Sequence, residues 1–344
     1  MRRRTLFTGA VAAGAALALP RTAAAAGRES EPYDATPDIE RLLFTPPVPQ
    51  QLPLTALQRS LAAARARFTT AAYHELGTAL PDLIAAAEAL RGSCTGRERE
   101  LANAATARGY VLATELAAKT HSDLAWATAD RAVQAAQLSG EPAVVGEAVR
   151  VLAITMRRAG RPAAAVDLLR RTADDLDTRP GPAARAVAAT LWMTAAYTAA
   201  CNHDASSAHD LMTGAAEAVD RLPTGLPPQQ LYTVDATPAQ ADLYRIGIHT
   251  ALGHPDLAVR YAARIDPAVL PTAERRARLG TDTARMWHAL GDGPRTLAAL
   301  QFVERVAPEE VRRPALRSMV TALVYAPMPT SGARELARRI GIAC

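Results

Sequence analysis

The sequence predicts an all-α protein built as an α-solenoid of stacked helix–turn–helix pairs, and three observations lead to this prediction. First, an Ala-rich helix, a tight turn and a second Ala-rich helix recur roughly every forty residues between residues 101 and 310. Second, four turns place a Gly where a helix can end in a left-handed conformation and a Pro where the next helix can begin. These turns are Ser139–Pro142, Ala159–Pro162, Leu252–Pro255 and Gly291–Pro294. Third, only 4% of the residues are aromatic while 49% are hydrophobic, and Ala-rich helices approach one another closely.

The expected helices follow one another from Leu54 onward, so the solenoid is expected to occupy residues 54–344. A long helix or helix pair covers 54–92, where Pro81 begins a new helix or marks a bend. In the turn after residue 201, Asn202 takes the place of the left-handed Gly. Five pairs and two closing helices are expected at 101–118 with 121–138, 143–158 with 162–176, 183–201 with 204–222, 238–252 with 255–266, 272–290 with 293–307, then 310–325 and 331–340.

Two segments lie outside the expected helices. Residues 27–53 are polar and rich in Pro, which is typical of an extended lead-in rather than a domain. Residues 223–237 contain three Pro and one Gly and interrupt the repeat. A long irregular loop in a repeat protein lies at the surface and often takes part in recognition.

The first 26 residues have the order of an export signal. Arg2–Arg4 are followed by an apolar run from Gly9 to Leu19 and by small residues that end at Ala26. The adjacent arginines are similar to those of a twin-arginine signal. The apolar run is shorter than the ~20 residues that span a bilayer. Two interpretations stay open, an exported protein cleaved near Ala26 and a short Ala-rich helix or linker.

The charge distribution does not favour nucleic-acid binding. The chain has a net charge of +5, but the first 26 residues hold four arginines and no acid, so the other residues together carry only +1. Later arginines alternate with acids, as in 274–276 and 309–313, and are interpreted as solvated helix faces rather than a basic stripe. Lys119 is the only lysine, which indicates a compositional bias of the genome rather than a functional choice.

No catalytic or metal-binding motif is found. None of the seven histidines is four residues from another, the spacing that places two ligands on one helical face. Cys94, Cys201 and Cys344 are far apart, and Cys201 falls on an apolar stretch as a small core residue. Adjacent acids such as Glu309-Glu310 are typical of surface positions. We therefore expect no cofactor, no metal and no enzyme, although a solenoid with a grafted active site stays open as a third interpretation.

The candidate binding residues lie on the first helix of each pair, because the first helices usually line the concave wall of a solenoid. Arg150 and Arg157 are seven residues apart and share a face, which suits an anionic group or a peptide backbone. Solvated arginines are the alternative. For Trp126, Trp192 and Tyr197 core packing is the favoured alternative. The full set of candidates is Tyr110, Arg150, Arg157, Trp192, Tyr197, Gln240 and Tyr244.

Several segments resemble a known family, and they do so in order along the chain. They are residues 72–84, 123–132, 156–161, 265–277, 307–312 and 334–341. Over about residues 50–343 the chain resembles the tetratricopeptide-like sensor region of actinobacterial helix-turn-helix transcriptional regulators of the Xre class. The resemblance implies a tetratricopeptide-like solenoid that senses a signal without catalysis.

The chain departs from this family in two respects. The family carries a DNA-binding helix-turn-helix domain ahead of the sensor region, and the sequence supplies none. In those regulators a stretch similar to Arg3–Phe7 often joins the two parts, which favours the linker interpretation. The family usually has an Asn and a His in the helix after the mid-array loop, where Gln240 and Tyr244 stand here.

The functional expectation is a cytoplasmic, non-catalytic sensor or adaptor of transcriptional regulation. It binds a small signalling molecule, a peptide or a regulator protein in its concave groove. Direct contact with nucleic acid and a membrane span are not expected, and a homodimer is left open. The main alternative is an exported helical-repeat binding protein.

Overall fold

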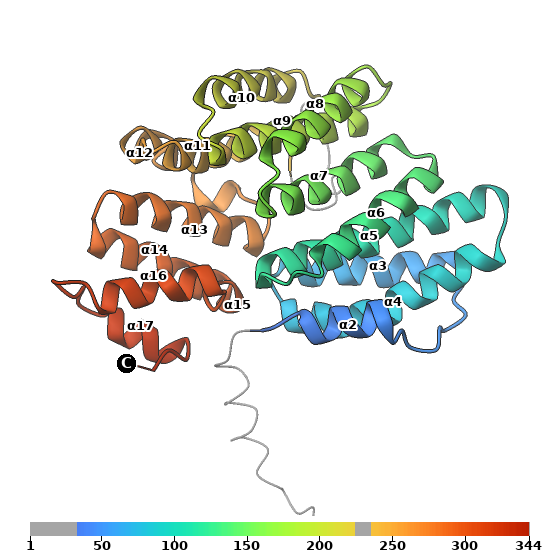
Figure 1. Cartoon of the computed structure of the whole chain (residues 1–344), viewed down its shortest axis with the longest axis horizontal. Helices are drawn as coiled ribbons and strands as arrows, with labels where there is room; N and C mark the ends of the chain where they lie inside the picture. The colour runs from blue at the N-terminus through green and yellow to red at the C-terminus, as the bar shows by residue number, and fades with distance from the viewer. Residues whose placement is uncertain (1–32, 224–234, 344) are drawn as a thin grey trace, which may run out of the picture.

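The computed structural model of the protein describes residues 33–223 and 235–343, which contain helices and connecting turns but no strand (Figure 1). Most helices pack against the helices next to them in the chain. This arrangement confirms the prediction of an all-α protein and is consistent with an α-solenoid. In chain order the helices are α2 (Thr36–Phe44), α3 (Leu54–Thr69), α4 (Tyr73–Ser93), α5 (Gly96–Thr120), α6 (Ala125–Ser139), α7 (Pro142–Arg158), α8 (Pro162–Asp177), α9 (Pro182–Cys201), α10 (Ala205–Asp220), α11 (Pro238–Ala251), α12 (Pro255–Ala262), the 3₁₀ turn η2 (Pro267–Val269), α13 (Ala273–Ala289), α14 (Gly293–Val306), α15 (Pro308–Val311), α16 (Pro314–Val324) and α17 (Ala333–Arg339).

The turns between consecutive helices have the predicted left-handed glycine and helix-starting proline. The left-handed backbone is adopted, with φ between 67° and 82°, at Gly140, Gly160, Gly253 and Gly291. A proline then opens the next helix at Pro142 of α7, Pro162 of α8 and Pro255 of α12. The prediction for Asn202 is wrong by one residue, because Asn202 has φ −94° and His203 adopts the left-handed conformation with φ 58°.

One helix, α2, lies within residues 27–53, which the sequence predicts to be extended. Helix α2 begins after Ala35, although the flanking residues are rich in Pro. Its residues Ile39, Leu42 and Leu43 have the i, i+3, i+4 spacing of one helical face and are buried against α4. A helix of nine residues is marginal in water, so packing against α4 stabilises it.

Helix α4 continues through Pro81, so no new helix begins at this position. A proline inside a helix costs about 3 kcal/mol. On the same helix Leu76, Leu80 and Ile84 are at most 1% exposed, and their burial offsets that cost. The chain breaks instead before Tyr73, where Ala71 has φ 61°.

The last helices return to the first ones, so the array closes on itself. Figure 1 shows the helices of the two ends of the array, α2–α4 and α15–α17, at the same end of the molecule. The Tyr73 hydroxyl donates a hydrogen bond of 2.6 Å to Glu310 across 237 residues of sequence, and the backbone N–H of His74 donates to Glu309. Helix α13 also contacts α3. The inner wall is therefore enclosed by both halves of the chain.

The two cysteines in the described residues, Cys94 and Cys201, are not fully buried in the core. Cys201 is exposed at the end of α9, so its interpretation as a core residue is wrong. Cys94 is half-buried, and Cys344 lies outside the described residues, as do residues 1–26 and most of the loop at 223–237.

We expect Leu191→Ala to lower the free energy of unfolding by about 2–5 kcal/mol, because Leu191 of α9 is fully buried and a cavity would remain. The control is Leu138→Ala, since Leu138 is 61% exposed and its loss should change stability by at most about 0.5 kcal/mol. Urea unfolding of both variants measures the difference. Equal effects would contradict the packing described for α9.

Candidate functional site

The inner wall holds a pocket of about 300 Å³ to which the first helix of every pair from α5 to α13 contributes. The prediction that first helices line the concave wall is therefore confirmed for this pocket. Seven arginines and one lysine lie in the lining, which is unusually cationic. The charged and aromatic lining residues are Glu115, Lys119, His121, Arg150, Arg157, Arg158, Tyr197, Tyr244, Glu274, Arg275, Arg278, Arg285 and Arg313.

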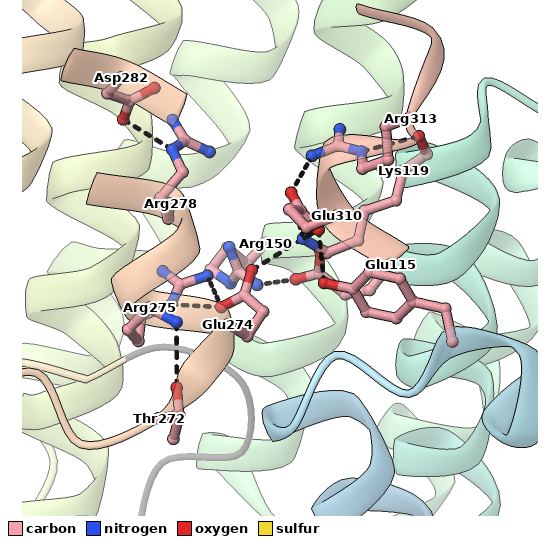
Figure 2. Close-up of polar contacts among 11 residues, drawn as sticks. Glu115, Lys119, Arg150, Thr272, Glu274, Arg275, Arg278, Asp282, Glu310 and Arg313 are labelled. Atoms are coloured by element: carbon pink, nitrogen blue, oxygen red, sulfur yellow. Dashed lines mark hydrogen bonds and ion pairs between the residues drawn. The ribbon is translucent and has the colours of Figure 1, made fainter. Parts of the chain in front are cut away.

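A buried ion cluster around Lys119 forms the floor of the pocket (Figure 2). The Lys119 ammonium lies 2.8 Å from Glu274 and 3.2 Å from Glu310, and these carboxylates are only 3% and 1% exposed. Arg275 donates to Glu274, and Arg313 donates to Glu310 and, at 3.0 Å, to the Lys119 carbonyl. Helices α5, α13 and α15 are thereby joined at one point.

The two carboxyl groups of this cluster are held ionised. Burial alone would raise the pKa of Glu274, but Arg275 and Lys119 outweigh burial and lower this pKa to about 2. Burial is likewise outweighed at Glu310, whose pKa Arg313 and Lys119 hold well below its usual value. Burial and then the charge of Glu310 raise the pKa of the Tyr73 phenol, which stays a hydrogen-bond donor.

The rim of the pocket, formed by Arg157 and Arg158, carries two arginines that have no carboxylate in direct contact within the described chain. Arg157 lies over the Tyr197 ring at 4.9 Å and donates to Thr198 at 3.1 Å. Arg158 donates to the carbonyl of Ala118. Among the described residues neither arginine has a carboxylate within 4.0 Å. On the opposite wall Arg278 and Arg285 share one carboxylate, Asp282, at 2.7 Å and 3.2 Å.

The charges of the pocket do not cancel. Eight cationic side chains line it, but only four acids pair with them in the described structure. These acids are Glu115, Glu274, Asp282 and Glu310. Burial and then Arg313 and Arg157 lower the pKa of Arg158. Burial and then Arg158 and Arg313 lower the pKa of His121. In both cases burial is the larger cause, and the neighbouring positive charges act in the same direction.

Two tyrosines form an aromatic side of the pocket. The Tyr197 ring lies between two guanidinium groups, those of Arg157 at 4.9 Å and Arg278 at 5.6 Å. Tyr244 meets Tyr197 edge to face, with ring centroids 6.4 Å apart. A Cβ atom on Gly247 would lie 2.9 Å from the Tyr197 ring, so glycine permits this close contact.

The structure brings four of the seven candidate residues together in this pocket. Arg157, Tyr197 and Tyr244 line it beside Arg150, which is buried and paired with Glu115. This pairing shows that Arg150 is not a solvated arginine.

The other three candidates lie elsewhere. Tyr110 lines a separate pocket with residues of α2 and α4, and its hydroxyl accepts a hydrogen bond from Arg131. Trp192 is half-buried and packs against the core. Gln240 is 1% exposed, and its Oε1 atom has no hydrogen-bond partner among the described residues. Trp126 is 37% exposed beside Arg161, so core packing is not its role.

The ion cluster of the floor is not among the features that the sequence predicts. Glu274 and Glu310 are expected to be surface acids and Lys119 a result of compositional bias, and the burial of all three corrects these expectations. One signal was present in the sequence. The single lysine stands near the end of a stretch, Val111–Ala118, in which the only charge is Glu115, and a lysine is rarely buried without a partner.

Within the described residues, no group of three or more His, Cys, Asp or Glu side chains could hold a metal ion. None of the helices described is long and apolar enough to cross a membrane. No family model, no curated protein and no solved structure matches the chain.

We expect the stability to fall steeply in acid because of Glu274. Its pKa is lowered on folding from 4.5 to about 2, so its stabilisation is present above about pH 5 and is lost as the pH falls towards 2. The Glu274→Gln variant should lose about 3 kcal/mol at pH 7 and depend less on pH between 5 and 3. Urea unfolding at several pH values measures both effects.

The control for this prediction is Glu335→Gln. Glu335 is 52% exposed and pairs with arginines at the surface, so its loss should change stability by less than about 1 kcal/mol at any pH. Parallel pH profiles of the wild type and Glu274→Gln would show that the cluster does not carry the acid sensitivity.

Proposed function

We propose that the protein is a non-catalytic receptor that binds a small molecule or a short peptide segment in the concave pocket and passes this signal to a partner in transcriptional regulation. The observation that carries the proposal is the pocket at the closure of the array. Its walls come from α5 and α7 on one side and α13 and the start of α16 on the other. A ligand that contacts both walls favours the closed arrangement over any open one.

The chemistry of the lining supports binding rather than catalysis. Arginine side chains stay protonated at physiological pH and therefore do not act as general acids or bases. The lysine is engaged by two carboxylates and is not a free nucleophile. Charged donors and aromatic faces around a small cavity are the usual means of fixing and orienting a ligand.

The regulatory part of the proposal rests on the resemblance of the sequence to the sensor regions described above. In this proposal the chain acts as a tetratricopeptide-like sensor or adaptor in the cytoplasm, and the partner makes any contact with DNA. A conformational response at the closure between α4 and α15 would change the outer surface that a partner contacts.

We expect the full-length protein, purified under native conditions from an actinobacterial host, to carry a non-covalent ligand in native mass spectrometry. Filling the pocket with Ala315→Trp should abolish this adduct whatever the charge of the ligand, because Ala315 lines the cavity. Ala164→Trp is the matched control, since Ala164 is exposed on α8. An adduct that persists in Ala315→Trp would contradict binding at this site.

The second candidate is an exported helical-repeat binding protein, which the arginine-led first 26 residues favour. Cell fractionation and the intact mass of a C-terminally tagged copy distinguish the two. We expect a full-length protein in the cytosol. A product that lacks about 26 residues and is found outside the cytosol would contradict the transcriptional role and leave an extracellular receptor.

A further inference from the structure

We propose that the ligand of the concave pocket is a small molecule bearing a compact, multiply charged oxyanion, held between Arg157 and Arg158 of α7 and Arg285 of α13. This inference rests on the proposed function, since it assumes that the pocket binds a ligand, and it assigns the chemical class of that ligand.

The cations of the floor and those of the rim differ in their partners. At the floor Lys119, Arg275 and Arg313 share Glu274 and Glu310, and Arg150 has Glu115, so each cation contacts a carboxylate. At the rim Arg157 and Arg158 have no carboxylate within 4.0 Å in the described parts of the chain. Burial lowers the pKa of Arg158, and the like charges of Arg313 and Arg157 lower it further, so these partly buried cations repel one another. A bound anion would remove this repulsion.

The guanidinium groups of Arg157 and Arg158 are held in place beside the pocket. Each of them is held by one hydrogen bond, Arg157 to the Thr198 hydroxyl and Arg158 to the Ala118 carbonyl. The Tyr197 ring further restrains Arg157. A guanidinium has five N–H donors, so most of them are left for a ligand. Restrained guanidinium groups suit bidentate contacts with phosphate or carboxylate oxygens.

The volume of the pocket suits a compact ligand. A pocket of about 300 Å³ lies at the lower end of the range for small-molecule sites, which fits a compact anion with a short organic part. The faces of Tyr197 and Tyr244 offer an apolar side for that organic part. Because Arg285 belongs to the opposite wall, the anion would tie the two halves of the array together.

The test is isothermal titration calorimetry of the full chain with inorganic pyrophosphate and with citrate, at constant ionic strength set with sodium chloride. The Arg157→Gln/Arg158→Gln variant should bind at least tenfold more weakly than the wild type. Its matched control is Arg170→Gln/Arg171→Gln, which removes two adjacent exposed arginines from α8 and should bind like the wild type. Arg157→Lys/Arg158→Lys keeps the charge and should recover part of the affinity.

A second variant and a second readout guard against a folding defect. Arg285→Gln weakens the site from α13 and should also bind at least tenfold more weakly. Thermal unfolding without ligand establishes that the variants are folded. Saturating pyrophosphate or citrate should raise the melting temperature of the wild type and of the α8 control, and should raise it little in the α7 variant.

The outcomes separate the sources of the anion. Tighter binding of pyrophosphate supports a phosphate ester, and tighter binding of citrate supports a polycarboxylate. Binding of neither probe above the chloride background, or equal binding by the α7 variant, overturns the inference. A neutral ligand in native mass spectrometry that Ala315→Trp excludes would also overturn it, while leaving the proposed function intact.

Discussion

The buried contact of Lys119 with Glu274 and Glu310 is the interaction on which the rest of the structure depends. It joins helices that are 155 and 191 residues apart in sequence. Removing three charges from water is unfavourable, so such a cluster stabilises little by comparison with apolar packing. Its effect is on specificity, because only the closed arrangement gives each of these buried charges a partner.

Closure changes the character of the inner wall. In an open solenoid the concave face is exposed to solvent along its length, and water screens the charges on it. Here the contact of Tyr73 with Glu310 brings the ends together and encloses the wall. The cations of the pocket then affect one another, and burial together with the charges of Arg158 and Arg313 lowers the pKa of His121. The same side chains on an open array would behave as ordinary solvated arginines.

The parts of the fold that local chemistry determines could be predicted from the sequence, and the parts that depend on distant contacts could not. The turn at Gly140–Pro142 is specified by backbone conformations that few residues adopt, so it is readable directly. By local rules Pro81 should end a helix, and residues 36–44 lie in a Pro-rich segment. Burial against neighbouring helices overrides both tendencies, and the sequence does not state which helices will be neighbours.

The candidate site divides in the same way, and this division argues for a ligand. Arg157 and Tyr197 could be predicted because helix position alone places them on the inner wall. The partners of Lys119 could not, since they come from segments whose alternating charges look like solvated faces. Once these partners are known, every cation at the floor of the pocket has a carboxylate within the chain, although Glu274 and Glu310 are each shared by two cations. At the rim Arg157 and Arg158 have none within 4.0 Å among the described residues, and a fold that gives its deepest cations a carboxylate would be expected to give one to these two arginines if their role were structural. Because neither arginine has a carboxylate within 4.0 Å in the described chain, the proposed anion would be the first acidic group in close contact with them.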